Sequence, residues 1–85
     1  MFLTYLKESG KLVPPMLTSD KSLTLEEVWG TEKAKIYEAI YDYINIEDKL
    51  EIIYNPNNYY VDIETKKLKL KVGNVDVDID VKYLD

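Results

Sequence analysis

Residues 67–80 read KLKLKVGNVDVDID, in which lysines alternate with apolar residues before the glycine and aspartates alternate with apolar residues after it. A period of two predicts β-strands that have one apolar and one polar face. Glycine followed by asparagine favours a two-residue loop of type II′ at positions 73 and 74. The stretch therefore predicts an antiparallel hairpin with strands at 68–72 and about 75–83.

The charges predict the register of this hairpin. A two-residue loop places Lys69 directly opposite Asp78. It also places Lys71 opposite Asp76. A slip of one residue would turn the apolar side chains into water, so charge and burial select the same pairing. A second two-residue turn upstream would set Asp62 opposite Lys69 on the other side of the same strand.

The alternation extends upstream, where the turn Asn55-Pro56-Asn57-Asn58 separates two further β-favouring segments. The C-terminal half therefore predicts a four-stranded antiparallel meander. Its expected strands are about 49–54, 59–63, 68–72 and 75–83.

Two helices are expected in the N-terminal half. Thr24 and Glu27 have the spacing of a capping box, which predicts a short helix that ends at Gly30. A longer helix is predicted from residue 31 to about residue 45, because isoleucines recur every four residues at positions 36, 40 and 44.

The first residues favour a β-hairpin. Segments 2–7 and 12–13 flank a turn at Ser9-Gly10, and the prolines at 14 and 15 are expected to end the ladder. The 85 residues are long enough for one core. We expect a single α+β domain over 1–85, with an N-terminal β-hairpin, one short and one longer helix, and the four-stranded antiparallel meander with the helix packed on one face.

The composition argues against catalysis. The chain has 16 acidic residues and 11 lysines but no arginine, histidine or cysteine, and its net charge is −5. Histidine and cysteine supply most general-base, nucleophilic and zinc chemistry near neutral pH. We expect no enzymatic activity, no cofactor and no metal. The aspartates of 76–80 lack the turn glycine and distal glutamate of a calcium loop, and we interpret them as part of a strand.

Charge and hydropathy also restrict partners and location. A negative chain repels a phosphate backbone, and the lysines of 67–71 already face aspartates, so we expect no direct nucleic-acid binding. No window approaches the roughly 18 apolar residues of a membrane span, and no basic leader is seen, so we expect no membrane insertion. The absence of cysteine favours a cytoplasmic location.

Two features of the expected polar sheet face have no role in folding. Strand pairing would set Ile53 beside Tyr60 as an apolar spot, and Glu51 beside Asp62. An apolar spot with an acidic rim is typical of a protein-contact site. The alternative is that the N-terminal hairpin or a loop covers Ile53 and Tyr60, and mimicry of nucleic acid by the carboxylates is left open. The predicted partner-binding residues are Ile53, Tyr60, Glu51, Asp62, Asp76 and Asp78.

Several segments resemble small accessory proteins of phages that infect low-GC Gram-positive bacteria. They are LVPPM at 12–16, TLEEV at 24–28 with EKA at 32–34 and IY at 36–37, and YVDIETK at 60–66. The resemblance spans most of the chain and carries over no functional residue. It implies a setting in which small acidic proteins join virions or inhibit host machinery, including nucleases.

The function expected is a non-enzymatic protein-binding module. As a phage or mobile-element protein in the host cytoplasm, it would inhibit or modulate a host protein, such as a nuclease or another nucleic-acid enzyme, through an acidic, tyrosine-bearing surface. The alternative is a virion or tail accessory protein that assembles with itself, which leaves a homodimer open.

Overall fold

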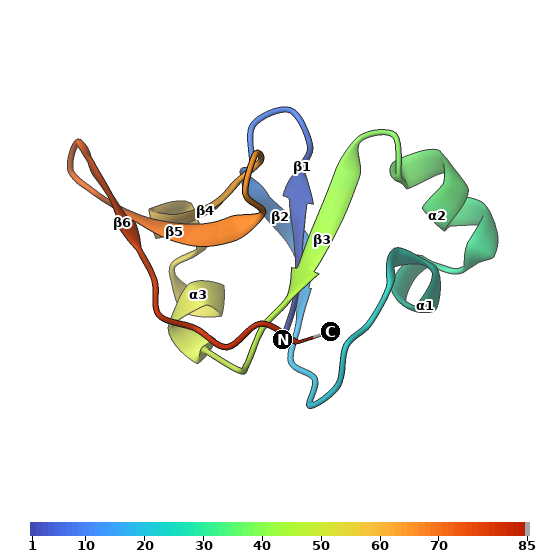
Figure 1. Cartoon of the computed structure of the whole chain (residues 1–85). Coiled ribbons are helices and arrows are strands. Elements are labelled where there is room, and N and C mark those ends of the chain that lie inside the picture. Colours follow the sequence, from blue (N-terminus) through green and yellow to red (C-terminus); the bar gives the residue numbers. More distant parts are fainter. Residues whose placement is uncertain (85) are drawn as a thin grey trace.

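A computed structural model describes residues 1–84 and confirms the α+β class (Figure 1). It contains two antiparallel three-stranded sheets whose strands run crosswise to each other. The first has the order β2-β1-β3, with β1 (Phe2–Leu6), β2 (Leu12–Leu17) and β3 (Tyr41–Asn45). The second has the order β4-β5-β6, with β4 (Tyr59–Asp62), β5 (Lys67–Val72) and β6 (Val75–Asp78). The helices are α1 (Leu25–Trp29), α2 (Thr31–Tyr37), α3 (Leu50–Tyr54) and the 3-10 helix η1 (Pro56–Asn58).

The predicted N-terminal hairpin is confirmed, but its prolines do not end the ladder. Thr4 pairs with Val13 and Leu3 pairs with Met16, so the two prolines between them form a bulge. The hydroxyl of the fully buried Thr4 donates to the carbonyl of Pro15 at 2.9 Å. This bond satisfies a polar group that the bulge would otherwise leave without a partner.

The helix predicted over 31–45 is wrong beyond Tyr37. Residues 41–45 form β3 instead, which pairs with the other side of β1. The central strand β1 is buried on both faces and needs a second neighbour for its backbone groups, and this requirement outweighs the helical spacing. As a result, two isoleucines of the expected buried stripe, Ile36 and Ile40, are 67% and 52% exposed.

The short helix α1 is confirmed with its capping box. The Thr24 hydroxyl accepts from the Glu27 amide, and the Glu27 carboxylate accepts from the Thr24 amide. Leu25 of α1 and Ala34 of α2 pack against Phe2 of β1 in a small cluster. The two helices therefore cover the face of the first sheet that carries Phe2.

The strand predicted at 49–54 is wrong, because this segment forms α3. Ile52 is fully buried, and the adjacent Ile53 packs against the same core. Neighbouring residues that both reach one core fit a helical turn and not a strand, in which they would point to opposite faces. The meander therefore has three strands.

The hairpin of β5 and β6 has the predicted register. Lys69 pairs with Asp78, and Lys71 pairs with Asp76. Gly73 has a φ of 61°, as the first position of a type II′ loop requires. On the other side, Asp62 pairs with Lys67 and not with Lys69, so the predicted two-residue turn is wrong. The side chain of Asp62 accepts from the Glu64 amide at 3.0 Å and shapes a four-residue turn.

The last strand ends earlier than predicted, at Asp78, and the following segment crosses to the first sheet. Tyr83 forms a bridge with Ile46, and the Leu84 amide donates to the carbonyl of Asn45 at 2.8 Å. The Tyr83 hydroxyl accepts from the Leu68 amide at 2.8 Å. This side chain thus replaces the strand partner that β5 loses where β6 ends.

The two sheets are also joined at their other ends. Lys11 forms a bridge with Tyr60, and the Val61 amide donates to the Gly10 carbonyl at 2.8 Å. The two junctions close the sheets around a shared core, and α3 packs against it. The buried members of this core are Met1, Leu3, Tyr5, Leu12, Ile44, Ile46, Ile52, Val61 and Leu68.

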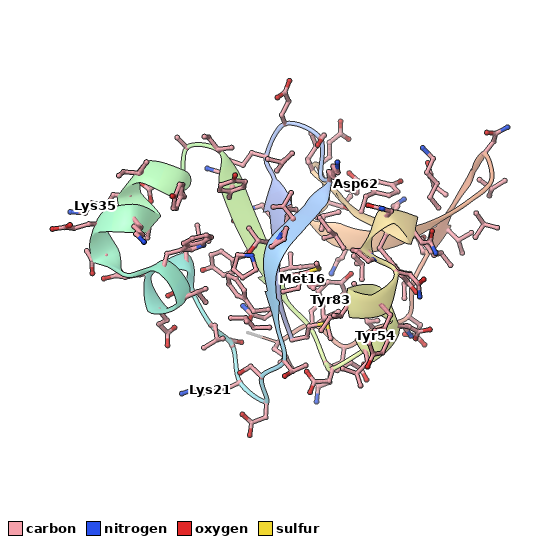
Figure 2. All side chains as sticks on the ribbon, turned by 180° about the vertical axis from the view of Figure 1, so that it is seen from behind. Met16, Lys21, Lys35, Tyr54, Asp62 and Tyr83 are labelled. Atoms are coloured by element: carbon pink, nitrogen blue, oxygen red, sulfur yellow. The ribbon has the colours of Figure 1, made fainter. Side chains whose placement is uncertain are left out.

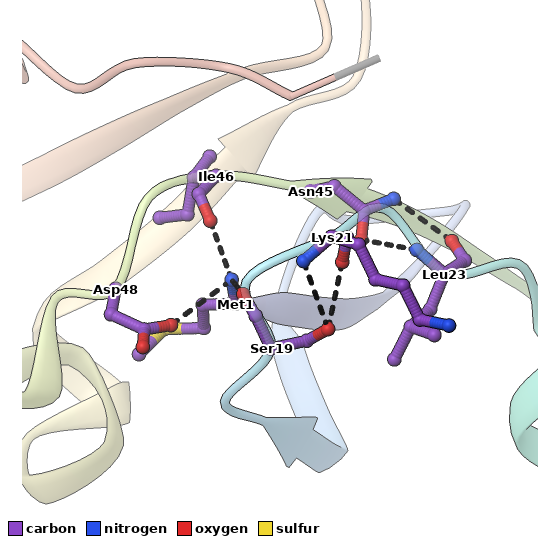
Figure 3. A network of polar contacts seen from close by, with 7 residues as sticks. All are labelled: Met1, Ser19, Lys21, Leu23, Asn45, Ile46 and Asp48. Atoms are coloured by element: carbon purple, nitrogen blue, oxygen red, sulfur yellow. Dashed lines mark hydrogen bonds and ion pairs between the residues drawn. The ribbon is translucent and has the colours of Figure 1, made fainter.

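Polar contacts hold the first residue and the loop before α1 against the end of β3 (Figure 3). The ammonium group of Met1 donates to the carbonyls of Ser19 and Ile46 and lies 3.2 Å from the Asp48 carboxylate. The side chain of Asn45 accepts from the Leu23 amide and donates to the Leu23 carbonyl, both at 2.9 Å. The buried amide thereby acts as a strand partner for one residue of the loop.

We expect Gly10→Ala to destabilise the fold much more than Gly30→Ala or Gly73→Ala. All three glycines have a positive φ, which costs a side chain about 1–2 kcal/mol. Only at Gly10 would the added Cβ also clash, since it would lie 1.8 Å from the Val61 carbonyl oxygen. Urea denaturation should show a loss of about 3 kcal/mol or more for Gly10→Ala. Equal losses for the three variants would contradict this account of the junction.

We expect stability to fall between about pH 10 and pH 12. Burial, followed by the nearby Asp42 carboxylate, raises the pKa of Tyr5 to about 12. Below the unfolded pKa of about 10 both states keep the proton, and above it the unfolded state loses the proton first. The loss should be on the order of 1–2 kcal/mol, measured by denaturation across this pH range. Tyr5→Phe should flatten the curve, whereas Tyr54→Phe, which removes an exposed hydroxyl, should not.

Candidate protein-binding surface

The second sheet has one polar and one apolar face, because its strands alternate. On the apolar face, Val61 and Leu68 are fully buried against the core. Toward the loop at Gly73 the same face loses its cover, since the hairpin of β5 and β6 projects beyond the rest of the chain (Figure 1). We define the projecting part, residues 71–78, as the hairpin arm.

The hairpin arm carries an exposed strip of valines. Val72, Val75 and Val77 are 55%, 61% and 42% exposed, although they continue the face that buries Leu68. Val72 and Val75 pair directly across the strands beside the loop. An apolar strip that the fold does not cover is the kind of feature that marks a contact site.

The polar face is organised around Lys69. Its ammonium lies 3.3 Å from the Asp78 carboxylate and 3.8 Å from that of Asp62. The contact with Asp78, more than that with Asp62, raises the pKa of Lys69. The pKa of Tyr60 is also raised, first by loss of water around its hydroxyl and then by the Asp76 carboxylate. Four of the predicted partner-binding residues therefore share this face.

The charges on the polar face are balanced. The side chains of Asp62, Asp76 and Asp78 lie on it, and so do those of three lysines, at positions 67, 69 and 71. The acidic rim expected for this face included Glu51 beside Asp62, but Glu51 lies on α3. The two signs of charge are not evenly distributed across the sheet. The aspartates of β6 lie on its edge strand, whereas the lysines of β5 lie on its central strand.

A groove of about 450 Å³ borders the polar face. It lies between the β1–β2 turn, η1 and the hairpin arm, and Lys11, Tyr60, Lys71 and Asp76 line it. Two lysines and one aspartate give it a mixed charge, so it extends the polar face without adding an acidic pocket.

Two of the predicted residues lie elsewhere. Ile53 packs against the core from α3 and is not paired with Tyr60. Glu51, on the same helix, is exposed and lies 3.2 Å from the Lys49 ammonium. The expected apolar spot at Ile53 and Tyr60 is therefore absent. Figure 2 shows Tyr54 of α3 and Asp62 of β4 at separate places, and Tyr54 is 75% exposed.

The valine strip was missed because alternation alone assigns valines to the core face. The available signal was position: these residues flank the Gly73 loop, at the greatest distance along the hairpin from the segments that build the core. Alternation shows which face a side chain occupies but not how far the covering elements reach.

The described part of the chain, residues 1–84, contains no group of three acidic side chains placed to hold a metal ion. Within the same residues, no helix is long and apolar enough to cross a membrane. No family model matches the chain, and comparisons with curated proteins and with solved structures find no similar protein.

We expect Lys69→Met to lower the urea midpoint more than Lys71→Met. Both changes remove one charge from the same face of β5, but only the ammonium of Lys69 lies within 4.0 Å of two carboxylates, those of Asp62 and Asp78. The difference should shrink in high salt, because salt screens exposed charges. A larger effect of Lys71→Met would show that the charges are not organised around Lys69.

Proposed function

We propose that this chain is a non-catalytic protein-binding module that docks on another protein through the hairpin arm. The observation that carries the proposal is the exposed valine strip of Val72, Val75 and Val77 beside the carboxylates of Asp76 and Asp78. Interfaces of this kind combine an apolar centre with a polar rim. Full burial of one valine contributes about 1.5 kcal/mol or more, so three in one strip could anchor a partner.

The resemblance to small phage accessory proteins suggests the setting. In this proposal the module acts in the cytoplasm of a bacterial host and inhibits or modulates a host protein, such as a nuclease or another nucleic-acid enzyme. Tyr60 and the aspartates of the polar face would supply directional contacts at the rim. The lysines at 67, 69 and 71 balance those aspartates, which disfavours mimicry of nucleic acid.

The second candidate is a virion or tail accessory protein that assembles with itself. Such a protein would use the open edge of β6, because an uncovered edge can pair with a strand of another chain. The predicted apolar spot of Ile53 and Tyr60, which could also have joined two copies of the chain, does not form. Light scattering after size exclusion separates the two functions, since the docking module should be a monomer and the assembly protein a larger species.

The docking surface is tested by capture from a lysate of a low-GC Gram-positive bacterium. The variant Val75→Thr with Val77→Thr keeps β-branched side chains but removes apolar surface, and it should lose the captured protein. The matched control is Ile36→Thr with Ile40→Thr, which changes two exposed apolar residues away from the arm. Circular dichroism confirms that both variants fold.

The control variant should capture the partner as the unmodified chain does. If the control loses the partner and the valine variant retains it, the contact surface lies on the α2 side and not on the hairpin arm.

A further inference from the structure

We propose that the partner supplies an extended segment in which basic and apolar residues alternate, and that this segment pairs antiparallel with β6 as a fourth strand of the second sheet. The inference rests on the proposed docking function and names the chemistry of the partner. Strand addition of this kind takes its affinity from backbone hydrogen bonds and its specificity from alternate side chains.

The backbone of β6 is open on one side. It is the last strand of its sheet, with β5 as its one neighbour. Pairs along an antiparallel ladder alternate between hydrogen-bonded and non-hydrogen-bonded, and the pair of Val72 and Val75 closes the two-residue loop. The N–H and C=O groups of Asp76 and Asp78 therefore point away from β5. These outward groups make no hydrogen bond to another backbone group within 1–84.

The edges of the other strands are at least partly occupied. The outer side of β4 receives the bridge from Lys11 and the bond between the Val61 amide and the Gly10 carbonyl. β2 contains Pro14 and Pro15, which have no N–H to offer. The end of β3 is held by the C-terminal segment through Leu84.

The side chains of β6 specify the residues that a new strand should carry. Directly opposed residues in an antiparallel pair share a face, so a residue opposite Asp76 or Asp78 meets a carboxylate. The Asp78 side chain is 87% exposed, although it already contacts Lys69 from the inner side. A residue opposite Val75 or Val77 meets exposed apolar surface. The complementary segment therefore alternates lysine or arginine with an apolar residue.

The chain itself contains one such segment. β5 reads KLKLKV and already pairs with β6 from the inner side, lysine opposite aspartate and apolar opposite apolar. The outer edge of β6 presents the same side chains with the opposite set of backbone groups. A partner strand would therefore repeat on the outside the pattern that β5 provides on the inside.

A second copy of this chain is a poor occupant. When two β6 strands pair antiparallel about a two-fold axis, the registers that oppose Val75 to Val77, or Val77 to its own copy, also place aspartate opposite aspartate. The register centred on Val75 runs into the loop at Gly73 and Asn74, so it pairs little more than that one residue. Like charges in directly opposed positions are destabilising. The charge pattern of β6 therefore selects a basic strand over its own copy.

The probe is the synthetic peptide Lys-Val-Lys-Val-Lys-Val, titrated into the ¹⁵N-labelled full chain to about 1 mM. We expect shift changes concentrated at residues 75–78. The peptide Glu-Val-Glu-Val-Glu-Val should leave these residues unchanged. Asp76→Asn with Asp78→Asn should weaken binding about 3- to 10-fold, because two cross-strand charge pairs are lost. The matched control, Glu32→Gln on α2 with Glu38→Gln at its C-cap, changes the net charge equally and should bind normally.

Backbone N-methylation distinguishes strand pairing from simple charge attraction. In the proposed pairing the lysine N–H groups of the peptide face the backbone of Asp76 and Asp78, and the valine N–H groups face solvent. Methylation of the lysine amides should abolish the shifts, and methylation of the valine amides should not.

Three results of the peptide titration would overturn the inference: no shift at about 1 mM, equal shifts with the acidic peptide, or undiminished binding after methylation of the lysine amides. If one of these occurs while Val75→Thr with Val77→Thr still loses the captured protein, strand addition is wrong but the docking function stands. A dimer that pairs through β6 would also overturn it.

Discussion

The contact between the β1–β2 turn and β4 is the one on which the structure depends. The Val61 amide donates to the Gly10 carbonyl, and the carbonyl of Val61 occupies the space that a Cβ at position 10 would need. Because Gly10 has no side chain, the turn of the first sheet can lie directly against β4. This junction, together with the bridge between Ile46 and Tyr83, encloses a core that neither three-stranded sheet could bury alone.

The short helices pack against the two sheets but do not form the junctions between them. α1 and α2 cover the Phe2 face of β1, and α3 packs Ile52 into the main core. Helices of 5–7 residues are not stable by themselves, so their hydrophobic contacts with the sheets hold them. Among residues 1–84, no helix covers the valine side of the projecting end of β5 and β6, and the valine strip therefore stays exposed.

Local signals predicted the elements that local interactions determine. The capping box of Thr24, the Gly73 loop and the register of β5 on β6 followed from spacing and charge. The strand at 41–45 and the helix at 50–54 did not, because the need of β1 for a second neighbour and the burial of Ile52 arise only in the assembled fold. Alternation placed Tyr60, Asp62, Asp76 and Asp78 on one face, as the structure has them. It assigned Ile53 to the surface and Val77 to the core, because it does not show where covering elements lie.

The contacts of Tyr83 link the motion of the segment after β6, residues 79–84, to the exchange of one buried amide. The hydroxyl accepts a hydrogen bond from the Leu68 amide, where a neighbouring strand would otherwise do so. The backbone of Tyr83 forms a bridge with Ile46, and the centre of its ring lies 4.2 Å from the Lys67 ammonium. Detachment of the segment would therefore free the Leu68 amide to exchange with solvent deuterium, even though Leu68 itself is buried in the core. The exchange rate of that one amide reports how often the C-terminal segment detaches from the rest of the molecule.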